Sequence, residues 1–238
     1  MKAGRVFHIL FATALLLTTP AVAAQERDSG FEVGIRTGYA FAAGHLGAPP
    51  SGTDANYDVD LGDRVSGQWP FWIDAGYRFN YSFYLGFYFQ YGIGFVNDDV
   101  LTTCRDANVD CSASDVRFGL MGRYHLPMVW QFSPWVGYGL GGEWLSYSGH
   151  RTDVSASADW SWSGLEYMNL QLGGDVRLPH RVVVAPFISF SLGHYDDRTE
   201  TRSGTLPILG AVTGTYTGVA KTSIHEWILI GLRVAVMP

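Results

Sequence analysis

The sequence has no long uninterrupted apolar segment beyond its N-terminus. A transmembrane helix needs about 18 or more consecutive apolar residues, and no stretch after residue 24 reaches that length. Charged residues are also scarce, at 16% of the chain, whereas 47% of residues are hydrophobic and 15% are aromatic. The first absence excludes a helical membrane protein. The second, together with 29 glycines, indicates a surface that faces lipid.

The N-terminus has the plan of a secretory signal peptide. Lys2 and Arg5 precede the apolar run 6–17, and Pro20 is followed by the small-residue sequence Ala-Val-Ala-Ala at 21–24. We therefore predict a signal peptide at residues 1–24, cleaved after residue 23 or 24, and one mature domain at residues 25–238. The alternative is an uncleaved anchor, but its apolar core is short for a membrane span.

Cations are the minority charge, with 16 Lys and Arg against 22 Asp and Glu. The predicted signal peptide removes two cations and no acid, so the mature chain carries a net charge of −8. An acidic protein is a poor partner for the phosphate backbone of nucleic acids. We therefore expect no nucleic-acid partner.

Cysteine is nearly absent. Cys104 and Cys111 are the two cysteines, and they lie in one polar segment of a chain that we predict is exported. A short loop between two cysteines of an exported protein favours a disulfide. Two free thiols, or half of a metal site, are the alternatives, but no further Cys or His stands at the spacing that zinc needs.

The chain does contain strong period-two alternation, clearest in the stretch 81–95, YSFYLGFYFQYGIGF. Its odd positions are all bulky and apolar or aromatic, whereas its even positions are small, polar or hydroxyl-bearing and carry no charge. A period of two predicts a β-strand. Because the weaker face carries glycines and no charge, we expect the bulky face to contact lipid and the small face to line a narrow lumen.

The same alternation predicts seven further strands, at about 31–41, 69–79, 115–125, 130–147, 160–178, 182–195 and 224–236. Long polar connections at 43–66, 96–113, 148–159 and 196–222 alternate with short turns, and 205–217 is a candidate for a small extra hairpin. The predicted fold is therefore all-β, an eight-stranded antiparallel up-and-down transmembrane β-barrel with its long loops at one end. A soluble barrel of the lipocalin kind is the alternative.

In this pattern the chain resembles the eight-stranded outer-membrane barrels of the OmpA transmembrane domain, OmpX and OmpW type. The last strand carries the nearest thing to a motif, GLRVAV at 231–236, which is similar to the assembly signal of such proteins but lacks a terminal aromatic residue. The resemblance implies a bacterial outer membrane, extracellular long loops and periplasmic termini. It also implies outer-membrane lipid, lipopolysaccharide and the barrel-assembly machinery as partners of a monomer.

The predicted lumen face carries charges on nearly every strand. Buried charges need partners, so we interpret them as a network of ion pairs that fills the barrel, since an eight-stranded barrel is too narrow for a wide pore. A narrow, gated path for ions or small solutes is the alternative. The residues are Glu32, Arg36, Asp74, Arg78, Arg117, Arg123, Glu143, Asp175, Arg177 and Arg233.

A second candidate site lies at the loop end of the last two predicted strands, where imidazoles and carboxylates would be neighbours. Such groups bind divalent cations, or act as base and orienter for a nucleophile such as Ser191 or Ser223. A solvated rim is the preferred interpretation, so we predict neither a metal nor a cofactor. The residues are His194, Asp196, His225 and Glu226.

The expected role is structural or surface-contacting, with no catalytic residue. The resemblance to the OmpW type allows a narrow channel or a binder of small hydrophobic solutes as the first alternative. Some eight-stranded barrels are lipid A deacylases or palmitoyl transferases, so a lipid-modifying enzyme is the second. The His-x-Ser pair of the deacylase does not occur in this sequence.

Overall fold

The computed structural model describes residues 29–47, 59–99, 101–127, 131–206, 210–219 and 222–236. The predicted signal peptide, residues 1–24, lies outside these ranges. None of the helices in the described ranges has the length and apolar character that a membrane-spanning helix requires.

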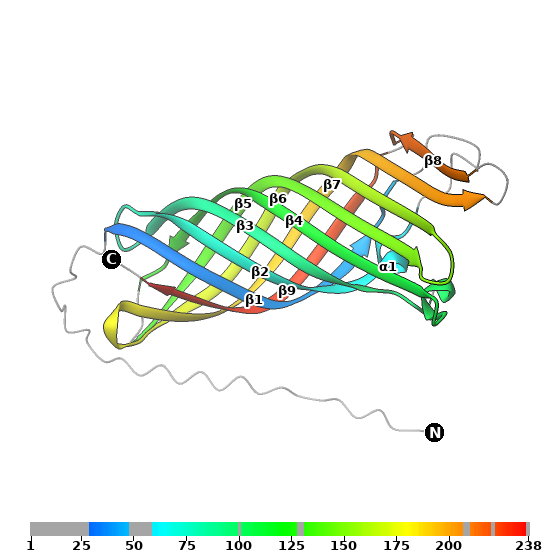
Figure 1. The fold of residues 1–238 in the computed structure, drawn as a ribbon. Helices are drawn as coiled ribbons and strands as arrows, with labels where there is room; N and C mark the ends of the chain where they lie inside the picture. The colour runs from blue at the N-terminus through cyan, green and yellow to red at the C-terminus, as the bar shows by residue number, and fades with distance from the viewer. Residues whose placement is uncertain are drawn as a thin grey trace, which may run out of the picture.

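Strands dominate the structure (Figure 1). Two 3-10 segments, Thr102–Arg105 and Pro179–Arg181, and one short helix, α1 (Leu61–Arg64), accompany them. The strands are β1 (Gly30–Gly44), β2 (Val65–Arg78), β3 (Phe83–Val96), β4 (Val109–His125), β5 (Phe132–Arg151), β6 (Ala156–Arg177), β7 (Val182–Leu206), β8 (Gly210–Thr217) and β9 (Ile224–Val236).

The sheet closes into a ring of eight antiparallel strands. Its order is β6-β5-β4-β3-β2-β1-β9-β7, and β6 also pairs with β7, which joins the two ends. Ile35 of β1, for example, pairs with Ile73 of β2 on one side and Val234 of β9 on the other. A closed ring leaves no ring strand with an unpaired edge, as a structure within lipid requires. The predicted fold class is confirmed.

The two faces of the barrel wall differ as the alternation predicts. On β3, the Phe87 side chain is 69% exposed on the outer face, whereas the neighbouring Tyr88 is 2% exposed on the inner face. Apolar and aromatic residues cover the outer face of every ring strand. A continuous apolar surface of this kind is found on proteins that face lipid.

At one end of the barrel the strands continue past the predicted boundaries. The predicted loop 148–159 is mostly a hairpin, because β5 runs to Arg151 and β6 begins at Ala156. The predicted loop 196–222 likewise contains the end of β7 and all of β8, which pair in the region where a small hairpin was expected. These extensions contain many Ser, Thr and charged residues, so their sequence lacks the continuous bulky apolar face that marks the membrane segment.

One face assignment on β6 was wrong. Strict alternation through the predicted strand 160–178 puts Trp162 on the outward face and Tyr167 on the inward face, but Trp162 is buried and Tyr167 is exposed. The register between β6 and β7 shifts between Glu166 and Met168, as at a β-bulge. An extra residue in one strand reverses the facing of everything before it, so this shift also turns Glu166 into the lumen.

Candidate functional site inside the barrel

The structure buries all but one of the predicted lumen charges. The exception is Arg177, the last residue of β6, which is half-buried. The buried residues separate into two groups along the barrel. We call them the turn-side cluster, toward the end with the short turns, and the loop-side cluster, toward the end with α1 and the long hairpins. Figure 1 shows these two ends of the barrel.

The turn-side cluster is rich in guanidinium groups. Arg123 contacts both Glu32 (2.7 Å) and Asp74 (3.2 Å), and Arg233 also contacts both carboxylates. Each of these carboxylates has a further arginine, with Arg78 on Glu32 at 2.6 Å and Arg36 on Asp74 at 2.7 Å. The members are Glu32, Arg36, Asp74, Arg78, Arg123, His125, Asp175 and Arg233.

Asp175 is the third carboxylate of this cluster. It accepts a hydrogen bond from the indole of Trp135 at 2.8 Å and lies 3.1 Å from the His125 imidazole. Arg78 is a further neighbour, at 3.7 Å. All three turn-side carboxylates therefore have a cationic partner, which is the condition for keeping buried charges stable.

The loop-side cluster has a different composition, with Arg117 at its centre. The Arg117 guanidinium reaches Asp115 at 2.8 Å, Glu143 at 3.2 Å and Glu166 at 3.3 Å. His225 adds a contact of 2.9 Å to Glu143. The members are Gln68, Tyr88, Gln90, Asp115, Arg117, Glu143, Glu166, Ser191, Tyr195, His225 and Trp227.

Neutral donors solvate the two glutamates of the loop-side cluster. Glu143 accepts hydrogen bonds from the Tyr195 hydroxyl (2.7 Å) and the Trp227 indole (3.1 Å). Glu166 accepts hydrogen bonds from the hydroxyls of Tyr88 and Ser191 and, at 2.9 Å, from the amide of Asn169. Hydroxyl, indole and amide donors thus replace the arginines of the turn side.

A chain of amides connects the two clusters. Arg36 donates to Gln171 (2.6 Å), Gln171 donates to Asn169 (2.9 Å), and Asn169 donates to Glu166. Aromatic rings surround Arg36, with its guanidinium carbon 5.2 Å from the ring centre of Trp72 and 5.4 Å from that of Phe187. Hydrogen bonds and aromatic rings therefore link the two clusters along the lumen.

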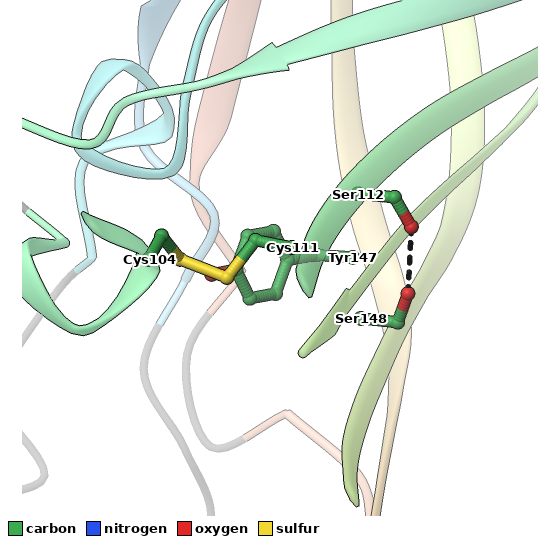
Figure 2. Close-up of a disulfide and its surroundings, with 5 residues drawn as sticks. All are labelled: Cys104, Cys111, Ser112, Tyr147 and Ser148. Carbon is green, nitrogen blue, oxygen red and sulfur yellow. Dashed lines mark hydrogen bonds between the residues drawn. A yellow bond between two sulfur atoms is a disulfide. The ribbon is translucent and has the colours of Figure 1, made fainter. Parts of the chain in front are cut away.

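Above the loop-side cluster, apolar side chains close the barrel mouth. Leu46 and Leu61, from the connection between β1 and β2, are buried with Val65, Leu145 and Tyr147. The structure joins Cys104 and Cys111 by a disulfide beside this cap, with the Tyr147 hydroxyl 3.0 Å from Cys104 Sγ (Figure 2). Ser112 and Ser148 share a hydrogen bond of 2.8 Å between the adjacent strands β4 and β5.

The structure does not bring the predicted rim cluster together. His194 and Asp196 lie 2.7 Å apart and partly exposed, whereas His225 faces the lumen, where its ring stacks on Tyr195 at 4.1 Å between centres. Glu226 follows His225 in β9 and points to the opposite face. Within the described ranges, no group of three or more His, Cys, Asp or Glu residues is placed to hold a metal ion.

Ser191 is also placed differently from the alternative in which it is a nucleophile beside a base. Its hydroxyl lies in the lumen, where it donates to Glu166 and accepts from Arg117 at 3.2 Å. The histidine of the same cluster, His225, is hydrogen-bonded to Glu143 instead. The polar groups around Ser191 therefore act as a buried network, walled off by the barrel from the membrane surface.

Sequence reasoning missed several loop-side residues. Glu166 was missed because the register shift in β6 inverts its facing. Asp115 could have been found, since it shares the inward face of its strand with Arg117. Gln68, Gln90 and Tyr88 are uncharged, and a search for charges on alternating positions passes over them.

Comparisons with known proteins agree with this geometry at the level of the fold. No protein-family model matches the chain, and no curated protein matches it. Among solved structures, a major outer membrane protein from Thermus thermophilus is similar over 88% of this chain and all of its own, with 11% identity and a TM-score of 0.52.

Two further solved structures are similar at lower TM-scores. The outer membrane protein AlkL has 15% identity, 93% and 96% coverage of the two chains and a TM-score of 0.49. OprG from Pseudomonas aeruginosa has 14% identity, 88% and 98% coverage and a TM-score of 0.40.

The closed ring, the apolar outer wall and the Thermus likeness together define the class of protein. The chain has the fold of an eight-stranded outer-membrane β-barrel, with an apolar outer wall of the kind that faces lipid. At these identities the likeness extends to the fold and not to a particular role.

Proposed function

We propose that this chain is a structural barrel of the outer membrane with a sealed lumen, which contributes to envelope integrity and contacts partners through its long hairpins. The observation that carries the proposal is the filled interior. Two clusters of paired charges, an amide chain between them and an apolar cap at the mouth occupy the lumen. In this proposal the protein is neither a channel nor an enzyme, and it uses no cofactor.

Ion pairing explains why such an interior resists conduction. An ion moving through the lumen would have to displace buried guanidinium and carboxylate groups from each other, which leaves unpaired charge away from water. Arg36 would also have to leave the rings of Trp72 and Phe187. A barrel of this strand number has room for its own side chains and little else.

The orientation and processing in this proposal follow the chain's connectivity. We place the long hairpins outside the cell, with both termini and the short turns in the periplasm of a Gram-negative bacterium. The signal peptide is removed on export, and the disulfide forms in the oxidising periplasm. Lipopolysaccharide and other outer-membrane lipids surround the monomeric barrel after the assembly machinery inserts it.

The hairpin extensions supply the contact surface. At their tips, residues of β5 to β8 line a pocket of about 340 Å³. Val212 and Tyr216 of β8 are exposed, as is Val154 between β5 and β6. In the β5–β6 turn, the hydrogen bond from Arg151 lowers the pKa of the exposed Asp153 carboxyl.

Planar-bilayer recording tests the sealed lumen. The refolded wild-type barrel is expected to give no current steps above the bare bilayer. A double variant, Arg36→Ala with Gln171→Ala, removes the bridge between the clusters and serves as the opened control, with brief current steps expected. Regular current steps from the wild type would contradict the sealed lumen and support a narrow channel. In a separate assay, loss of acyl chains from lipid A mixed with the wild type would support a lipid-modifying enzyme.

A further inference from the structure

The loop-side cluster carries more buried negative charge than its cations balance. Asp115, Glu143 and Glu166 are carboxylates, and Arg117 is the guanidinium that contacts all three. His225 contributes a positive charge only when it is protonated, and it contacts Glu143 alone among these carboxylates. An unbalanced charge within a lipid-embedded wall is costly, and either a proton or a bound cation would offset it.

Asp115 differs from the other two carboxylates because one of its oxygens accepts no hydrogen bond from the described residues. Glu143 and Glu166 each accept hydrogen bonds from several donors, as described above. Asp115 receives all of its contacts on Oδ2, from Arg117, Gln68 and Gln90. Its other oxygen, Oδ1, is buried and has no hydrogen-bond partner in the described part of the chain.

Two buried amide oxygens beside Asp115 also lack a hydrogen-bond partner among the described residues. Gln68 and Gln90 donate through Nε2 to Asp115 Oδ2, at 2.9 and 3.2 Å, and both side chains are buried. Their Oε1 atoms have no hydrogen-bond partner among the described residues. Exchanging oxygen and nitrogen in either amide would set its oxygen against the carboxylate, so the unpartnered atoms remain oxygens.

The backbone is arranged to bring these three side chains together. Gln68 is on β2, Gln90 on β3 and Asp115 on β4, so Gln68 reaches across an intervening strand. It crosses at Gly92, the pairing partner of Asp115, where an added Cβ would lie 1.8 Å from Gln68 Oε1. A glycine at this position is therefore required for the contact.

We propose that Asp115, Gln68 and Gln90 hold one hard divalent cation of the calcium type in the loop-side cluster. Calcium binds carboxylate oxygens together with the carbonyl oxygens of Asn and Gln side chains, and all three unpartnered atoms are of these kinds. The donor set contains no sulfur or nitrogen, which disfavours zinc and copper. The cation offsets the excess carboxylate charge and fixes β2, β3 and β4 to one another inside the plug.

The test counts calcium in the folded protein. Mature protein is refolded in detergent with millimolar calcium chloride, and the free ion is removed by gel filtration. The folded fraction is identified by its faster gel migration before boiling than after. Calcium bound to this fraction is then measured by native mass spectrometry. One calcium per chain is expected for the wild type. Gln68→Met and Gln90→Met each remove one ligand oxygen and are expected to lower the affinity about tenfold or more.

Gln171→Met is the matched control. It also removes a buried luminal amide, but the Gln171 oxygen already accepts from Arg36, so this variant is expected to lose stability and keep its calcium. If a methionine variant fails to fold, Gln68→Glu provides the second test, since the added carboxylate is expected to raise calcium affinity. This readout is independent of the bilayer recording, so the two proposals fail separately.

Three outcomes would overturn the cation site. The folded wild type could carry no calcium, Gln68→Met and Gln90→Met could retain it at wild-type affinity, or Gln68→Glu could bind it no more tightly. Equal calcium binding by the wild type and both methionine variants would place the ion outside the loop-side cluster. Stability that depends on pH but not on calcium would show that a proton balances the cluster instead.

Discussion

The turn-side cluster surrounds three carboxylates with four guanidinium groups, whereas the loop-side cluster surrounds three carboxylates with Arg117, His225 and neutral donors. In the first, Glu32 and Asp74 each have several arginines, so no single arginine is indispensable. In the second, Glu166 and Asp115 depend on Arg117 for their positive partner. The comparison shows that one barrel stabilises buried acids by redundancy at one end and by hydrogen-bond donors at the other.

The largest expected effect comes from removing the central arginine on each side. Arg117→Met leaves three carboxylates without their shared guanidinium and is expected to lower the free energy of unfolding by about 3–5 kcal/mol. Arg123→Met leaves Glu32 with Arg78 and Arg233, and the expected loss is about 1–3 kcal/mol. Urea unfolding of both variants in the same micelles measures the difference, and equal losses would show that the two clusters do not differ in redundancy.

Paired tyrosine substitutions test the role of neutral donors. Tyr88→Phe removes a hydroxyl that donates to Glu166 and is expected to cost about 1–3 kcal/mol of unfolding free energy. Tyr84→Phe is the matched control, because the buried Tyr84 hydroxyl has no hydrogen-bond partner within the described ranges, although Arg123 lies 3.9 Å from its ring centre. The control is expected to change the unfolding free energy little. A comparable loss in both variants would contradict a stabilising role for the Tyr88 hydrogen bond to Glu166.

A glycine substitution probes the approach of Gln68 to Asp115. Gly92→Ala places a methyl group against the Gln68 amide and is expected to cost about 1 kcal/mol, because the side chain can move aside at the loss of its hydrogen bond. Gly122→Ala is the control on β4, where an added Cβ would be 3.8 Å from its nearest neighbour. Thermal unfolding curves that shift equally for both would mean that the Gln68 contact contributes nothing.

The smallest effect is a gain in stability outside both clusters. His180 and Arg181 have φ angles of 64° and 61° in the short turn between β6 and β7, a conformation that costs most side chains about 1 kcal/mol or more. His180→Asn with Arg181→Gly is expected to raise the unfolding free energy by about 1 kcal/mol without altering the difference between Arg117→Met and Arg123→Met. A loss of stability would mean that this turn is held by side-chain contacts of the two native residues.

Much of the fold could be predicted from the sequence, because the face on which a strand residue lies depends on its neighbours along the chain. Period-two alternation predicted eight ring strands, and the predicted bounds of the last strand, 224–236, agree with those of β9. The odd residues of 81–95 face outward as expected. Alternation involves only neighbouring residues along one chain segment, so it can be recognised in the sequence before the fold is known.

The grouping of the inward residues was decided by the tertiary structure. The shift in β6 turned Glu166 inward and Tyr167 outward, and no residue type in that segment marks the extra residue. His194 and His225 belong to paired strands, yet the wall of the barrel separates them. Which charges meet across a lumen depends on the register between strands, and register is set by the closure of the whole ring. The sequence by itself therefore determined most of the residues that line the barrel, while the closed ring decided the facing of Glu166 and the division of the buried charges into an arginine-rich and an arginine-poor cluster.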